Sequence, residues 1–78
     1  MRILLIEDHQ RLAQSIVEGL AGFGFGVDLF MTAEEGLAAT KSISYDAIIL
    51  DLGFTFHVAV NKSRQHIAPR WLWRGSLR

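Results

Sequence analysis

Two short apolar segments of this chain each end in carboxylates. Residues 3–6 run into Glu7 and Asp8, and residues 47–50 run into Asp51. Segments this short, with no polar alternation, are typical of strands that are buried on both faces of a parallel sheet. Because functional sites in such sheets lie beyond the carboxyl ends of the strands, these three acids are the first candidates for chemistry.

The rest of the first 50 residues alternates between strand and helix patterns. After residue 10, apolar residues recur at helical spacing until three closely spaced glycines at 22, 24 and 26 end the helix. Thr32 with Glu35 three residues on forms a capping box, which predicts the start of a second helix. The predicted elements are strand 2–6, a helix from about residue 10, strand 27–31, a helix from 32 to about 41, and strand 45–50.

This alternation predicts right-handed βαβ units and a parallel sheet. We therefore expect an α/β fold with the element order βαβαβ. It would form a partial doubly wound (flavodoxin-like) parallel sheet with the strand order 2-1-3. The first strand then lies between the other two, which places Glu7 and Asp8 beside Asp51.

Three carboxylates this close repel one another unless a cation lies among them. Oxygen ligands at a partly open site suit Mg²⁺, which keeps waters that a phosphate can displace. Glu7, Asp8 and Asp51 therefore predict a magnesium site for phosphoryl chemistry. Taken alone, Glu7 and Asp8 would be interpreted as the N-terminal cap of a helix, where acids are favourable. His9 is interpreted as an exposed helix start rather than as a metal ligand.

Composition narrows the class of protein. The 78 residues allow one small domain, and half of them are hydrophobic, which argues against disorder. The chain has no cysteine, which excludes disulfides and thiolate metal sites. The apolar segment 3–6 is too short for a signal peptide or a membrane span, so we expect a cytoplasmic protein without membrane contact.

The residues around the acids carry a resemblance to a known family. The stretches are Arg-Ile-Leu-Leu-Ile-Glu-Asp at positions 2–8, residues 24–36, and Tyr-Asp-Ala-Ile-Ile-Leu-Asp-Leu-Gly at 45–53. They resemble the receiver domain of bacterial two-component response regulators, of the type that carries a winged-helix DNA-binding domain. The resemblance covers residues 1 to about 53. It implies a phosphorelay protein of signal transduction and transcription regulation, which is a phosphoacceptor and not an enzyme.

The resemblance also implies a role for each acid. Asp51 would accept a phosphoryl group from a phosphohistidine of a sensor histidine kinase, which gives an aspartyl phosphate. Glu7 and Asp8 would hold Mg²⁺ together with Asp51 and the backbone carbonyl of Gly53. DNA would be reached only through an effector domain that this chain lacks.

Residues after Gly53 depart from that family. A receiver continues with a loop of the type Leu-Pro-x-x-Asp/Ser-Gly and two further βα units, which supply a Ser or Thr and a Lys, and residues 54–78 match none of these. We interpret residues 1–53 as a truncated receiver-like domain and residues 54–78 as a basic tail, such as a frameshift would produce. The missing units would expose the edge of strand 45–50, so we expect impaired phosphorylation and self-association through that edge. The alternating residues 54–60 fit either an added strand or an aggregation-prone segment.

Charge divides the chain at the same place and leaves other functions open. Residues 1–51 hold eight acids and three bases, whereas residues 52–78 hold five bases and no acid. A basic segment with Trp71 and Trp73 suits a nucleic-acid-binding peptide, an anionic membrane surface or chance composition. The alternative enzyme is a phosphoaspartyl phosphatase of the haloacid-dehalogenase type, with Asp51 as nucleophile. That motif needs a second aspartate where Gly53 stands.

Overall fold

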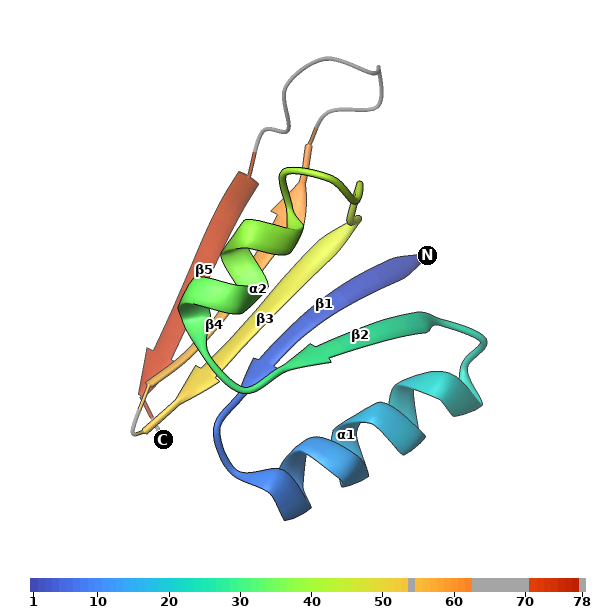
Figure 1. Cartoon of the computed structure of the whole chain (residues 1–78), viewed down its shortest axis with the longest axis vertical. Helices are drawn as coiled ribbons and strands as arrows, with labels where there is room; N and C mark the ends of the chain where they lie inside the picture. The colour runs from blue at the N-terminus through green and yellow to red at the C-terminus, as the bar shows by residue number, and fades with distance from the viewer. Residues whose placement is uncertain (54, 63–70, 78) are drawn as a thin grey trace.

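The computed structural model describes residues 1–53, 55–62 and 71–77 of the chain, which form one sheet with two helices (Figure 1). The first five elements confirm the predicted strands and helices, with ends that differ by one or two residues. In chain order the elements are β1 (Arg2–Glu7), α1 (Gln10–Gly22), β2 (Gly26–Phe30), α2 (Ala33–Ala39), β3 (Ala47–Leu52), β4 (Thr55–Asn61) and β5 (Trp71–Leu77).

The strands lie in the order β2-β1-β3-β4-β5. β1 pairs in parallel with both β2 and β3, which confirms the α/β class and the 2-1-3 order of a partial flavodoxin-like sheet. β4 and β5 are antiparallel to their neighbours. β4 is the added strand that the alternation at 54–60 allowed. β5 was not predicted, because its segment was interpreted only through its charge and its tryptophans.

A tight turn at Gly53 explains why β4 runs antiparallel to β3. Only residues 53 and 54 join the two strands, and Gly53 has a φ of 60°, a left-handed conformation that glycine adopts without strain. The chain therefore reverses and pairs along the outer side of β3. The prediction that the edge of strand 45–50 is exposed is wrong, because β3 is paired on both sides. Within the described residues, the outer strands are β2 and β5.

The interior strand β1 is buried from both faces of the sheet. Its Leu4 and Ile6 belong to a buried cluster with Tyr45, Ile48 and Ala59, and α2 packs against this cluster through Ala33 and Ala39. The two crossovers run in opposite directions along the sheet, so their right-handedness places α1 on the other face. Alternate residues of β1 point to that face, and all residues from Ile3 to Glu7 are buried.

Gly36 of α2 sets how closely this helix approaches β1. A Cβ added at Gly36 would lie 2.5 Å from both Cγ1 and Cδ1 of Ile6, which is fully buried. We expect Gly36→Ala to lower the free energy of unfolding by roughly 1–3 kcal/mol in urea denaturation, because overpacking forces the helix away from the strand.

The matched control is Gly19→Ala in α1, where an added Cβ meets nothing within 4 Å. This substitution should raise the free energy of unfolding by about 1 kcal/mol through helix propensity alone. Equal effects of the two substitutions would contradict this account of the contact between α2 and β1.

Candidate functional site

The carboxyl ends of β1 and β3 bring two acids together. Glu7 and Asp51 are register partners in the parallel pair, so their side chains leave the sheet on the same face. Only 1% of Glu7 and 2% of Asp51 is exposed. Burying two carboxylates at adjacent positions is costly in free energy unless their charge is compensated. This pair is therefore the strongest sign of a functional site among the described residues.

The segment that follows β1 is held by two hydrogen bonds. The backbone N–H of His9 donates to Oε1 of Glu7 at an N···O distance of 2.9 Å, which orients this carboxylate. His9 is also the N-cap of α1, and its Nδ1 accepts a hydrogen bond from the backbone N–H of Leu12 at 3.3 Å. The interpretation of His9 as an exposed helix start is confirmed.

A pocket of about 550 Å³ opens beside the acid pair. It is lined by Glu7, Asp8, His9, Leu12 and Gly53. Three of the four predicted metal-site residues therefore share one pocket. The fourth, Asp51, is the register partner of Glu7 within the sheet.

The donor groups around this pocket fit a magnesium ion. Carboxylate and carbonyl oxygens, such as those of Glu7, Asp8 and Gly53, are the ligands that Mg²⁺ prefers. The convergence of three acids on one metal ion stays a prediction. In the described parts of the chain, no group of three or more His, Asp or Glu side chains is placed to hold a metal ion. Glu7 and Asp51 lie buried within strands, whereas Asp8 follows the end of β1 and is exposed.

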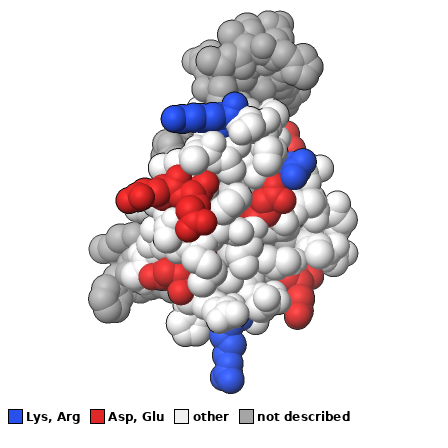
Figure 2. All heavy atoms as spheres, in the orientation of Figure 1, with Lys and Arg blue, Asp and Glu red and all other residues white. Residues whose placement is uncertain are grey.

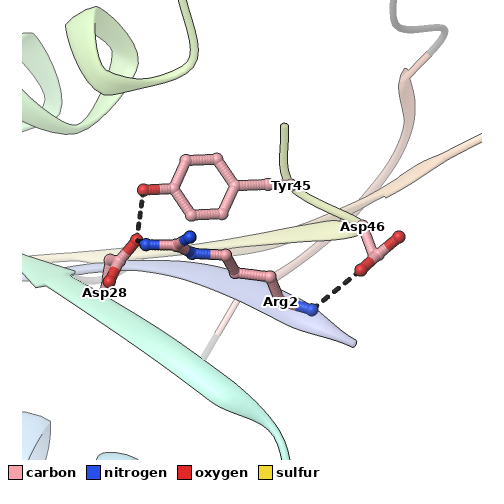
Figure 3. A network of polar contacts seen from close by, with 4 residues as sticks. All are labelled: Arg2, Asp28, Tyr45 and Asp46. Carbon is pink, nitrogen blue, oxygen red and sulfur yellow. Dashed lines mark hydrogen bonds and ion pairs between the residues drawn. The ribbon is translucent and has the colours of Figure 1, made fainter. Parts of the chain in front are cut away.

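A second polar cluster lies toward the amino ends of the strands (Figure 3). Nε and Nη2 of Arg2 donate to Oδ2 of Asp28 at 3.1 and 2.9 Å, and the hydroxyl of Tyr45 donates to the same oxygen at 2.6 Å. The backbone N–H of Arg2 donates to Oδ2 of Asp46 at 2.8 Å. These bonds tie β1 to β2 and to the segment before β3, which is a structural role.

The sequence analysis missed this second cluster, because its members lie far apart along the chain. The available signal was Tyr45, since a buried phenol hydroxyl normally has a hydrogen-bond partner. Asp28 falls within the predicted strand 27–31, but the sequence does not indicate that it lies beside Leu4 of β1.

The nucleic-acid alternative rests on the basic segment 52–78, of which residues 54, 63–70 and 78 lie outside the described residues. Figure 2 shows acidic side chains across the middle of the visible face and separate basic side chains toward its periphery. This face therefore has no continuous basic surface of the kind that contacts a phosphate backbone. Of the helices in the described residues, none has the length and apolar character that a membrane crossing requires.

Comparison with curated proteins shows which proteins this chain is similar to. Over 52 residues, 67% of its length, the chain is 48% identical to the transcriptional regulatory protein QseB of Haemophilus influenzae and 50% identical to QseB of Escherichia coli O157:H7. Over the same number of residues it is 46% identical to the cell cycle response regulator CtrA of Brucella ovis. These matches are consistent with a response-regulator receiver fragment. No protein-family model and no solved structure matches the chain.

The matched part spans only a fraction of the length of its relatives. The match covers 24% of each QseB protein and 22% of CtrA, so the chain spans about a quarter of the length of the curated relatives that it matches. Its 52 residues agree in length with the family resemblance at residues 1 to about 53. The names of these relatives confirm that resemblance: the QseB proteins are named as transcriptional regulatory proteins and CtrA as a response regulator. None of the three is named as a phosphatase.

The second polar cluster yields a prediction in alkaline solution. Burial, and then the hydrogen bond to Asp28, raise the pKa of Tyr45 to about 12. The stabilisation that the neutral phenol contributes is therefore fully present below a pH of about 10, the unfolded pKa, and is lost as the pH rises through about 12. Because Tyr45 is the only tyrosine of the chain, tyrosinate absorbance reports its ionisation alone.

We expect a tyrosinate midpoint near 12 in the folded chain and near the ordinary value in urea. Asp28→Asn should lower the folded midpoint, because it removes the negative charge beside the phenol. Tyr45→Phe should lower the free energy of unfolding at neutral pH by about 1–2 kcal/mol, since it removes a hydrogen bond to a charged group. An ordinary midpoint in the folded chain would contradict the hydrogen bond between Tyr45 and Asp28.

Proposed function

We propose that the receiver fragment accepts a phosphoryl group on Asp51 from a sensor histidine kinase, with Mg²⁺ bound beside it. The observation that carries this proposal is the buried, in-register pair of Glu7 and Asp51 at the carboxyl ends of adjacent parallel strands. Relatives that are named as response regulators support it. In this role the chain is a phosphoacceptor, and it does not turn over a substrate.

The proposed transfer does not require a general base from the protein. A carboxylate oxygen of Asp51 attacks phosphorus while the bond from phosphorus to the imidazole of the kinase breaks, and the imidazole leaves with a proton from solvent. An ionised carboxylate needs no general base, so the rate depends on positioning and on neutralisation of charge. β3 positions Asp51, and the N–H of His9 positions Glu7 beside it.

The metal would be held by oxygen atoms of the chain itself. Glu7, Asp8 and Asp51 would supply carboxylate oxygens, and Gly53 would supply its backbone carbonyl. When bound, Mg²⁺ neutralises charge on the phosphoryl oxygens. The pocket lined by Glu7, Asp8 and Gly53 supports this assignment.

Residues 54–78 would extend the sheet and would supply no residue to the phosphoryl transfer. We assign receiver function to residues 1–53 and treat the remainder as a tail outside the family pattern, although its strands β4 and β5 continue the same sheet. Because residues 54–78 do not supply the Ser or Thr and the Lys of a receiver, phosphorylation is expected to be slow. DNA would be reached only through a separate effector domain. Self-association would use the outer strands β2 and β5 in place of the covered edge of β3.

Asp51 is tested by incubating the chain with acetyl phosphate and Mg²⁺ and measuring the intact mass. We expect slow gain of one phosphoryl group, and we expect Asp51→Asn to abolish it because the nucleophilic carboxylate is lost. Asp46→Asn is the matched control, since it changes an exposed aspartate just before the same strand. Phosphorylation that persists in Asp51→Asn would refute the assignment.

The metal is tested by isothermal titration calorimetry. We expect weak binding of Mg²⁺ at millimolar concentrations, which Asp8→Ala and Asp51→Ala should each abolish, because each removes a carboxylate ligand. Glu34→Ala should leave the titration unchanged, because Glu34 is an exposed acid in the first turn of α2. Unaltered binding of Mg²⁺ in both aspartate variants would contradict the assignment of the metal site.

A further inference from the structure

The neighbour of Asp51 on β4 is an aromatic residue. Phe56 is the register partner of Asp51 in the antiparallel pair β3–β4, while Glu7 is its partner on the other side, in β1. Directly opposed residues of neighbouring strands place their side chains on the same face of a sheet. Asp51 therefore stands in a row between a carboxylate and a phenyl ring.

The backbone hydrogen bonds make Asp51 and Phe56 a close pair. At the other end of the ladder, the N–H of Asn61 donates to the carbonyl of Asp46 at 2.9 Å, so those two residues form a hydrogen-bonded pair. Hydrogen-bonded and non-hydrogen-bonded pairs alternate along an antiparallel ladder. Following the register makes Asp51 and Phe56 a non-hydrogen-bonded pair. In such pairs the Cα atoms lie only about 4.5 Å apart and the side chains are closest.

Burial agrees with this placement. Phe56 is half-buried, and Asp51 is 2% exposed although it stands near the end of its strand. The pocket beside the acids is lined by Glu7 and Gly53 but does not include Asp51 in its lining. Asp51 is therefore covered, and the residue directly opposite it on β4 is aromatic.

We infer that Phe56 is a steric shield that restricts access of phosphodonors to Asp51. In transfer from acetyl phosphate, a bond forms between a carboxylate oxygen of Asp51 and phosphorus, the bond from phosphorus to the acetate oxygen breaks, and acetate leaves. The donor must approach in line and needs room for three phosphoryl oxygens. A phenyl ring at the closest cross-strand position takes up part of that room. The consequence for phosphorylation rests on the proposed function, whereas the shielding of the carboxylate does not.

Shielding is measured without phosphorylation by coupling exposed carboxylates to glycine ethyl ester with a carbodiimide and mapping the labelled residues by peptide mass spectrometry. Phe56→Ala should raise labelling of Asp51 by roughly threefold or more, because truncation leaves a cavity beside it. Val58→Ala is the matched control: it removes apolar bulk from the same strand and face, opposite Ile49. The exposed Asp46 serves as the internal standard.

Two further variants separate shielding from loss of structure. Phe56→Val removes the ring but keeps a residue that suits a strand, so it should also raise labelling, whereas Phe56→Tyr keeps the ring and should not. Far-ultraviolet circular dichroism checks that each variant is folded. The inference that Phe56 shields Asp51 would be wrong if labelling of Asp51 were unchanged in Phe56→Val. It would also be wrong if labelling rose as much in Val58→Ala as in Phe56→Ala.

The same variants are then treated with acetyl phosphate and Mg²⁺. Faster phosphorylation of Phe56→Val than of the native chain is the expected result. Increased labelling with no phosphorylation in any variant would uphold the shield and refute the proposed function. Asp51-dependent phosphorylation at equal rates, with equal labelling, would refute the shield and leave the proposed function standing.

Discussion

The parallel pairing of β1 with β3 is the constraint on which the rest of this chain depends. It makes β1 an interior strand, buried on both faces, and so defines where α1 and α2 can pack. It also sets the register that places Glu7 beside Asp51. The acid pair is therefore a product of strand register, and a slip of one residue would direct one of the two side chains to the opposite face.

The sequence was sufficient for the fold of the first 52 residues because its local signals agree with one another. The apolar segments, the glycines after α1 and the capping box each mark an element or its end, and the capping bond is present, with the N–H of Glu35 donating to Oγ1 of Thr32 at 3.2 Å. Alternation of strand and helix then leaves few topologies, because crossovers are right-handed. The strand order followed from this restriction.

The sequence was less informative about how deeply the acidic side chains are buried and about which strands and side chains pair. The pattern places Glu7 and Asp8 at the same strand end, but one residue separates a buried side chain from an exposed one, and periodicity alone does not say where the strand stops. The uncovered edge expected for strand 45–50 rested on the family pattern. It failed because a two-residue turn at Gly53 returns the chain onto β3. The partnership of Arg2, Asp28 and Tyr45 joins three distant segments, so no local pattern indicated it.

The turn at Gly53 also has a consequence for the order in which the sheet is assembled. β3 and β4 are joined by two residues, whereas β1 and β3 are separated by two helices and a strand. Closing a short loop costs less conformational entropy than closing a long one, and local antiparallel pairs form faster than distant parallel ones. The hairpin of β3 and β4 can therefore form before β1 arrives. The strand that the ribosome makes first then docks onto a β3 whose other side is already occupied, so the carboxylate of Asp51 meets Phe56 before it meets Glu7.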